Sequence, residues 1–558
     1  MSDFRPNPMV RLLPSLTDVA FLLPIGFVFL FMQGAVSMLG DGDTGWHVRT
    51  GEWILRNGRV PHTDIFSYTM PGQPWFAWEW LWDVSFGWLH QRWGLGAVVA
   101  ASMAVLGVTF ALLFRLVLRK CPNPFVALTV TAWAAAGSSI HYLARPHLFT
   151  LLFVVMIYGI LETASEGRAR RLWVLPPLMM VWTNVHGGFL AGLLLVGMYA
   201  AGEVAGGLWE TNPERRQQAL KRARRLLGIE AACLAATLIN PYNYHLHIHI
   251  YQYLRDPGLW QTISEFLPLN FRGPIAWMAE PMFLLAILTG AWNLYRRRFV
   301  YPILILVWAH LALTAARNLP IFLLIAAPLV GEMFSAIVQR AQRAEVREWI
   351  RAAATRFEVV ASEFAVLDRI PRLHLASTVV MGLLSVAICA PHASAKFRPE
   401  YDSTRYPARA LPVLSSAASQ RIFTHDEWGD YLIYHLYPSR KVFVDGRSDF
   451  YGPVFDEKYM DVMRVKGDWE RNLNQYGVDT ILLPVEESLV EVLKESSKWR
   501  VVYDDGMAIV FRSTLRPPAR DSAAAEHGFS DLFNNRTQKR TAARDSSMAV
   551  AQNPNFRS

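Results

Sequence analysis

Residues 19–43 read VAFLLPIGFVFLFMQGAVSMLGDGD, and this stretch decides the fold class. It opens with an apolar run of about 20 residues, long enough to cross a bilayer as a helix. It ends in an acidic motif that contains Asp41 and Asp43. Arg5 and Arg11 precede the run, so the positive-inside rule predicts a cytoplasmic N-terminus. Because no small-x-small cleavage site follows, we interpret the run as a first membrane span.

Apolar segments of this kind recur along the chain. The further segments that we interpret as spans lie near residues 95–114, 125–140, 148–162, 172–184, 188–206, 226–240, 277–294, 299–315, 319–338 and 374–391. Hydrophobic residues make up 52% and charged residues 18% of the sequence, a composition shifted toward membrane proteins. We therefore predict an α-helical polytopic protein of the cell (inner) membrane with about eleven transmembrane helices.

Clusters of basic residues test this topology. They lie at residues 115–120, 168–171, 215–225 and 296–298, and a basic amphipathic segment follows at 339–372. With the spans above, every cluster falls on the cytoplasmic side, as the positive-inside rule requires. The net charge of +9 thus orients helices and does not indicate a nucleic-acid partner. The sequence also lacks a P-loop or nucleotide fingerprint, which argues against a nucleotide-sugar or ATP-driven enzyme.

The polar motifs gather at the opposite, outer face. They are Gly40–Asp43, Ala144–His147, Asn184–Gly188, Asn240–Tyr242 and Arg317–Pro320. Ionisable residues near a bilayer are costly, so a cluster of them at one face indicates a functional site that opens away from the cytoplasm.

The first outer loop, residues 40–94, begins with two carboxylates. Asp41 and Asp43 lie two residues apart in a Gly-containing turn, where they can converge on one substrate hydroxyl or one cation. Asp43 has a simpler alternative role as the cap of the amphipathic helix that follows and ends at Asn57-Gly58. That role does not explain Asp41.

Further acidic residues occur later in this loop. An amphipathic stretch from Trp75 to His90 places Glu79 and Asp83 four residues apart, where both can face one cleft. We predict a site role for Glu79 and a solvated helix face for Asp83. Asp64 fits a turn or cap, with substrate binding as the alternative.

Residues 395–513 predict a small extracytoplasmic α/β domain. Short apolar strands are expected at residues 421–424, 441–444, 480–483, 499–503 and 507–511, with a hairpin turn at 504–506. Asp445-Gly446-Arg447 follows one of them, and we interpret it as a turn with a local ion pair. Residues 514–558 have few large apolar groups and are predicted to be disordered.

The arrangement resembles the GT-C superfamily of membrane glycosyltransferases, in particular the protein O-mannosyltransferase-like and aminoarabinose-transferase-like bacterial group. The motifs that carry the resemblance are DGD (41–43), DTGWHVRTGEWIL (43–55), GRVP (58–61), TDIFSY (63–68), DEWGDYL (426–432) and VDGRSD (444–449). The chain lacks the Asp-Glu doublet that follows the first span in the mannosyltransferases. The resemblance implies transfer of a sugar from a polyprenyl-phosphate donor to a glycan, lipid or protein acceptor at the outer face.

The residues fit this chemistry. Such a reaction needs a base for the acceptor and positive charge for the departing phosphate. Asp41 is our first choice for the base, with Asp43 assisting it or holding a divalent cation, Mg or Mn. Arg145 and Arg317 lie at headgroup depth and suit a phosphate; snorkelling is the alternative. Further candidate substrate contacts are His147, Asn184, His186 and Tyr242.

Two other functions compete with this prediction. A transporter or flippase of lipid-linked sugars predicts polar residues near the membrane midplane and an internal repeat, neither of which is clear in the sequence. A non-catalytic envelope scaffold predicts that the carboxylates of the first loop are dispensable.

Overall fold

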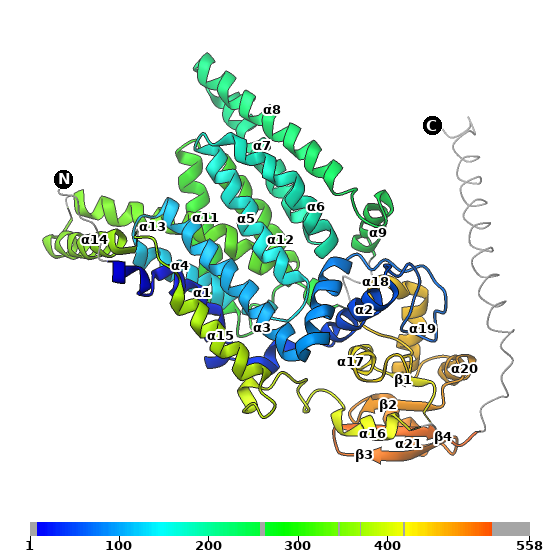
Figure 1. The fold of residues 1–558 in the computed structure, drawn as a ribbon. Coiled ribbons are helices and arrows are strands. Elements are labelled where there is room, and N and C mark those ends of the chain that lie inside the picture. Colours follow the sequence, from blue (N-terminus) through cyan, green and yellow to red (C-terminus); the bar gives the residue numbers. More distant parts are fainter. Residues whose placement is uncertain (1–7, 257–262, 344–345, 369, 417–418, 516–558) are drawn as a thin grey trace, which may run out of the picture.

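The computed structural model describes residues 8–256, 263–343, 346–368, 370–416 and 419–515. A long bundle of helices forms the larger part, and a small domain with a four-stranded sheet lies at one end of it (Figure 1). The bundle helices are α1 (Leu16–Leu30), α3 (Trp80–Lys120), α4 (Pro124–Gly137), α5 (His147–Ser165), α6 (Leu175–Val185), α7 (Phe189–Trp209), α8 (Pro213–Ala236), α11 (Ala276–Tyr295), α12 (Val300–Thr314), α13 (Leu319–Arg343) and α15 (Leu375–Cys389).

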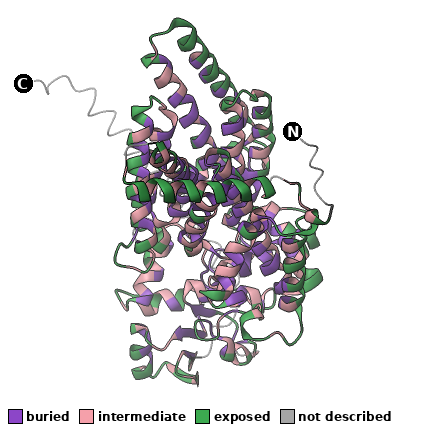
Figure 2. Ribbon diagram, turned by 90° about the vertical axis from the view of Figure 1, so that its left-hand side faces the viewer, coloured by how far each residue is buried: buried purple, intermediate pink, exposed green. Residues whose placement is uncertain are grey.

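Each segment predicted to span the membrane overlaps one of these helices. Helices long and apolar enough to cross a bilayer occur at Met9–Leu30, Trp80–Lys120, His147–Ser165, Phe189–Trp209 and Ala316–Arg343, and α12 and α15 are apolar but shorter. The molecule is thus a helical membrane protein, and the number of eleven spans stays a prediction. Figure 2 shows buried residues concentrated along the bundle, whereas the charged first half of α8 is largely exposed.

The first helix ends earlier than the apolar run predicts. α1 stops at Leu30, and a 3-10 turn, Gly34–Leu39, carries the chain to the acidic motif. α2 (Asp43–Asn57) then begins, and Gly58 ends it in the left-handed conformation at φ 66°. The alternative role of Asp43 as a helix cap is wrong, because its side chain makes no capping bond; instead Asp41 Oδ1 accepts the N–H of Asp43 at 2.8 Å.

α2 packs closely against the first turns of α3. A Cβ on Gly51 would lie 1.7 Å from the carbonyl oxygen of Asp83, and one on Gly87 would lie 2.8 Å from the carbonyl carbon of Gly51. Two glycines therefore allow the backbones to touch. Most of the predicted amphipathic stretch and the second span form one element, α3, which bends at Gly94, where φ is 71°.

The remaining elements lie outside the bundle. They are α9 (Tyr244–Leu254), α14 (Glu348–Asp368), α16 (Leu411–Leu414), β1 (Ile422–Thr424), α17 (Asp426–Leu436), α18 (Ser448–Tyr451), α19 (Pro453–Met463), α20 (Trp469–Gln475), β2 (Thr480–Pro484), α21 (Ser488–Glu495), β3 (Trp499–Asp504) and β4 (Ala508–Ser513). The sheet order is β1-β2-β4-β3; β1 and β2 are parallel, and the other pairs are antiparallel.

Four of the five predicted strands are present, and one prediction is wrong. Residues 441–444 form no strand, because Val442 makes only single bridges, to Ser67 and to Ile422. The first outer loop thus reaches into the small domain. α17 packs on α2, which joins the two parts of the chain (Figure 1). The predicted disorder of 514–558 falls almost wholly outside the described residues.

Candidate active site

The acidic motif after the first helix meets Arg145. Arg145 Nη1 lies 2.6 Å from Asp41 Oδ2, and Nη2 lies 2.5 Å from Asp43 Oδ2. The three side chains keep 29% (Asp41), 15% (Asp43) and 20% (Arg145) of their surface exposed. One guanidinium therefore bridges two carboxylates, in a place that is confined but still reachable from outside.

Backbone contacts bring these residues together. The N–H of Ala144 donates to the carbonyl of Met38 at 2.7 Å, and the hydroxyl of Thr44 donates to the carbonyl of Ala144 at 3.2 Å. These two hydrogen bonds connect the loop before α5 to the residues on both sides of the acidic motif. The indole N–H of Trp46 donates to Asp43 Oδ1 at 3.1 Å, so all four oxygens of Asp41 and Asp43 accept a hydrogen bond or ion pair.

Burial and neighbouring charges shift the pKa values of Asp43 and Arg145. Burial raises the pKa of Asp43, and Asp41 raises it further, while Arg145 opposes both. The pKa of Arg145 is raised as well, because Asp41 and Asp43 outweigh the effect of burial. The Nε of Arg145 is buried and makes no hydrogen bond to any described residue. Arg145 thus has a spare donor beside two carboxylates.

Glu79 lies between two histidines in the same region. Its carboxylate oxygens are 3.6 Å from His47 Nε2 and 3.6 Å from His186 Nε2. Burial raises the pKa of Glu79 to about 8, and the charges of Arg145 and Asp43 act on it. The other ring nitrogen of His47, Nδ1, lies 2.7 Å from Asp83 Oδ1. The predicted solvated position of Asp83 is wrong, since the residue is 0% exposed.

The two histidines predicted to bind substrate are held by their neighbours. His186 Nδ1 accepts from the N–H of Gly188 at 3.0 Å, which leaves Nε2 to carry the proton that faces Glu79. Burial lowers the pKa of His186 to about 3, and Arg317 and Arg145 lower it further, so the ring is neutral. His147 Nε2 donates to the carbonyl of His141 at 2.8 Å.

Arg317 lies near this group but pairs with a different carboxylate. Its Nη1 is 3.5 Å from Glu265 Oε1, and its guanidinium lies over the ring of Phe266 at 4.4 Å. The pKa of Glu265 is lowered, because Arg317 and Arg145 together outweigh burial. Arg317 and Arg145 also act together on the neighbouring His186. Both predicted phosphate ligands therefore contribute positive charge to one region.

Two other predicted substrate contacts, Asn184 and Tyr242, support the walls of the site. Asn184 Oδ1 accepts the indole N–H of Trp80 at 2.7 Å. The hydroxyl of Tyr242 accepts the N–H of Ala77 at 2.8 Å and donates to the carbonyl of Pro61 at 3.1 Å. Both side chains fix the segment that carries Glu79.

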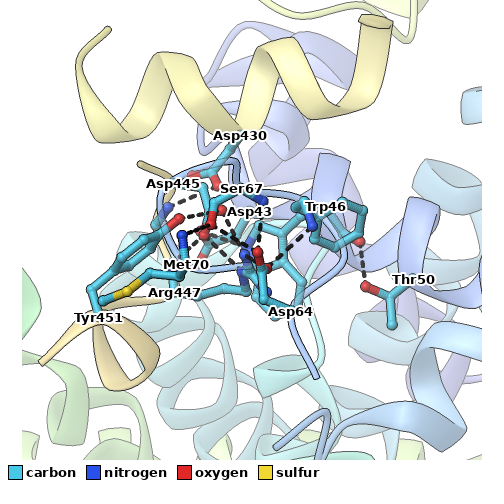
Figure 3. A network of polar contacts seen from close by, with 12 residues as sticks. Asp43, Trp46, Thr50, Asp64, Ser67, Met70, Asp430, Asp445, Arg447 and Tyr451 are labelled. Carbon is cyan, nitrogen blue, oxygen red and sulfur yellow. Dashed lines mark hydrogen bonds and ion pairs between the residues drawn. The ribbon is translucent and has the colours of Figure 1, made fainter. Parts of the chain in front are cut away.

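Asp64 belongs to a buried network that joins the loop to the small domain. Arg447 Nη2 lies 2.7 Å from Asp64 Oδ1, and its Nε lies 2.7 Å from Asp445 Oδ1 (Figure 3). The guanidinium also lies over the ring of Trp75 at 4.5 Å. The predicted local pair of Arg447 with Asp445 is present, but it is buried and extends across the chain to Asp64.

The small domain also supplies a third carboxylate beside Asp43. A Cβ on Gly446 would lie 2.5 Å from both Asp43 Oδ1 and Asp430 Oδ2, so glycine is needed where these two carboxylates meet (Figure 3). Asp430 Oδ1 accepts the N–H of Gly446 at 2.9 Å. Burial raises the pKa of Asp430, and Asp43 raises it further.

Four residues of this site carry no predicted role: His47, Asp83, Glu265 and Asp430. The i,i+4 spacing of Glu79 and Asp83, with Gly51 and Gly87 on the facing helices, is a signal for the buried contact with His47. Asp430 lies far along the chain from Asp43, and no local pattern joins the two.

The described residues contain no group of three or more His, Cys, Asp or Glu side chains arranged to hold a metal ion. A scan against protein-family models gives no match, and neither does a search of curated proteins.

Solved structures do share the fold. The oligosaccharyltransferase of Archaeoglobus fulgidus in its apo form matches with a TM-score of 0.56 at 10% identity, over 89% of this chain and 74% of that one. AglB from the same organism, in complex with an inhibitory peptide and a dolichol-phosphate, matches with a TM-score of 0.52 at 10% identity and the same coverage. ArnT from Cupriavidus metallidurans bound to undecaprenyl phosphate gives a TM-score of 0.47 at 13% identity, over 91% and 98%. The two archaeal structures carry the argument, and with them the predicted resemblance in fold to GT-C membrane glycosyltransferases is confirmed.

Proposed function

We propose that this protein is a membrane glycosyltransferase that moves a sugar from a polyprenyl-phosphate donor to an acceptor at the extracytoplasmic face of the cell (inner) membrane. The observation that carries the proposal is the bridge from Arg145 to Asp41 and Asp43. In this bridge, an arginine suited to a phosphate and two candidate bases contact one another.

The bridge suggests how the donor activates the base. A phosphate that enters the site competes with the two carboxylates for the guanidinium, because arginine binds phosphate through the same paired N–H groups. Asp41 then loses its cationic partner and is free to act as a general base. It accepts the proton of the acceptor hydroxyl while that oxygen attacks the sugar carbon from the side opposite the phosphate. Transfer therefore inverts the configuration of the sugar.

The other candidates surround this step. Arg317 adds a second positive charge for the phosphate, and His147 and His186 supply neutral rings for sugar or phosphate oxygens. Asp43 assists Asp41, and the carboxylate of Glu79 lies 3.6 Å from His186 Nε2. Asn184, Tyr242 and Asp64 take part indirectly, since their described contacts hold the first outer loop.

The arrangement does not fit a divalent cation at Asp43. Its two oxygens already accept from Trp46 and pair with Arg145, and a guanidinium beside both carboxylates opposes the binding of a second cation. The prediction of Mg or Mn at Asp43 therefore enters no step of the proposed mechanism.

The shared fold adds support. The archaeal AglB is in complex with a dolichol-phosphate and an inhibitory peptide, so a protein of this fold accommodates both of these ligands. Its identity to this chain is only 10%, so the residues and not the comparison carry the roles given above.

The direct experiment is reconstitution. The purified protein, in vesicles that contain a panel of polyprenyl-phosphate sugars and a cell-envelope extract as acceptor, should release free polyprenyl phosphate. Release should stop in Arg145→Ala. Movement of the intact lipid-linked sugar between leaflets without release would support the flippase, and binding without either event would support the scaffold.

A further inference from the structure

A cavity of about 300 Å³ lies in the small domain, outside the site described above. We call it the strand-end cavity, because β1 and β2 pair in parallel and the residues that follow both strands line it. The lining residues are His425 after β1, Glu487 and Ser488 after β2, and Tyr459, Met460 and Arg464 on or directly after α19. The carboxyl ends of parallel strands are the usual ligand-binding place of α/β sheets, and ligand pockets have volumes of about 300–1,000 Å³.

The polar groups of the strand-end cavity are not paired with one another. Within the described ranges, the side chains of Arg464, Glu487 and Ser488 make no hydrogen bond or ion pair. His425 Nδ1 lies 2.9 Å from Asp426 Oδ1, which leaves Nε2 for a ligand. A guanidinium donor and a carboxylate acceptor therefore line one cavity without contacting each other.

This mixture of charges selects the kind of ligand. The negative charges of Glu487 and Asp426 oppose the binding of an anion, and the positive charge of Arg464 opposes the binding of a cation. A neutral ligand with several hydroxyl groups fits both, because each hydroxyl donates one hydrogen bond and accepts others. The polar lining thus favours a saccharide over a phosphate or an amine.

The rest of the lining is apolar. Tyr459 is 7% exposed, and its hydroxyl accepts the N–H of Asp426 at 3.2 Å, so the phenol group is already bonded within the domain. Met460 lies beside it on α19, and methionine adapts its shape to the surface that it contacts. A sugar ring carries hydroxyl groups at its edge and C–H groups on its faces, which matches a cavity with both kinds of lining.

The strand-end cavity is close to the acidic motif of the first outer loop. α17 begins at Asp426, directly after His425. A Cβ on Gly42 would lie 2.7 Å from the carbonyl oxygen of Glu427 and 2.8 Å from Cβ of Asp430, so the acidic motif touches the first turn of α17. From Asp426 to Asp430 the helix rises by about 6 Å. The cavity and the carboxylates of the candidate active site thus lie about one helical turn apart.

We propose that the strand-end cavity is a saccharide-binding subsite, which holds one part of an acceptor glycan while the reacting hydroxyl of that glycan lies at Asp41. This inference rests on the proposed function and narrows its acceptor to a glycan. His425, Arg464 and Glu487 bind the ligand here and take no part in the chemical step.

The first test measures binding without any donor. The purified full-length protein in lipid nanodiscs is titrated with a panel of neutral tri- and tetrasaccharides of hexoses and N-acetylhexosamines, and saturation-transfer NMR gives the affinity. Arg464→Ala and Glu487→Ala should each weaken binding by about 10-fold or more, because each removes a hydrogen bond to a charged group. Neither side chain has a partner in the described part of the chain, so the thermal unfolding of both variants should match the wild type.

The matched controls remove the same charges elsewhere in the small domain. Arg471→Ala on α20 and Glu491→Ala on α21 replace side chains that are 83% and 73% exposed and do not line the cavity. Both controls should bind the saccharides as the wild type does.

The second test measures transfer to a glycan acceptor. Arg464→Ala and Glu487→Ala should raise the acceptor KM by about 10-fold. They should leave kcat and the donor KM unchanged, because a contact made equally in the ground state and the transition state affects KM alone.

Equal saccharide affinity in the wild type, Arg464→Ala and Glu487→Ala would overturn the inference, as would a wild type that binds none of the saccharides. Cavity-dependent binding of uncharged peptides or inorganic phosphate in place of saccharides would also overturn it. Cavity-dependent saccharide binding by a protein that transfers no sugar would support the subsite and contradict the proposed function. Transfer to a glycan with an unchanged acceptor KM in both variants would leave the proposed function standing and remove the subsite.

Discussion

Replacement of Arg447 by methionine tests what joins the small domain to the first outer loop. Arg447 is 2% exposed and pairs with Asp64 and Asp445, which are 6% and 1% exposed. Arg447→Met keeps most of the side-chain volume but leaves two buried carboxylates without their cation. Breaking a buried ion pair in this way costs about 3–5 kcal/mol. The population in which the domain is detached should therefore rise by roughly 10²–10⁴-fold.

Native-state proteolysis of the C-terminal domain measures this population when reclosing is faster than cleavage. The control is Arg405→Met, because Arg405 pairs with Glu427 at 3.1 Å and both side chains are exposed (54% and 38%). Its loss should raise cleavage by less than about fivefold, since exposed pairs contribute about 0–1 kcal/mol. Adding Asp64→Asn and Asp445→Asn to Arg447→Met should restore protection. Equal cleavage of the Arg447 and Arg405 variants would refute the reasoning.

Three further outcomes are expected. Arg145→Lys and Arg317→Lys should each raise the donor KM with folding intact, because lysine lacks the paired donors; unchanged donor kinetics in both would remove these residues from the site. Gly446→Ala should lower transfer and loosen the small domain, because its methyl group would lie 2.5 Å from two carboxylate oxygens; normal activity would show that the close approach is unnecessary. A periplasm-active reporter should work when fused after residue 513 and fail when fused at 225; the reverse would invert the topology and place the site on the cytoplasmic side.

The sequence predicts the site best where one local pattern decides the position. Asp41 and Arg145 both lie at the outer ends of apolar segments, so hydropathy and charge alone put them at one face, and the structure joins them at 2.6 Å. The same argument applies to Arg317. No local pattern decides which side chains of the first outer loop are buried, because their burial depends on which helices pack against one another.

Asp83 shows this limit clearly. A carboxylate on an amphipathic helix normally faces water, yet the contact of Gly51 with the backbone of Asp83 turns it onto His47. The position of Asp430 depends on α17 packing against α2, a contact between segments far apart in the chain. Residues 441–444 have the apolar pattern of a strand but meet Ser67 and Ile422 at single bridges, so the tertiary context decides.

The most direct test of the central claim is the transfer rate of purified Asp41→Asn with a polyprenyl-phosphate sugar donor. Asparagine keeps the volume of the side chain and its hydrogen bond to the N–H of Asp43, so expression and thermal stability should match the wild type. Asp402→Asn, at an exposed turn of the small domain, is the control and should transfer normally. The account predicts a loss of about 10²–10⁴-fold in kcat for Asp41→Asn, the range for a general base. A rate within about twofold of the wild type would contradict it.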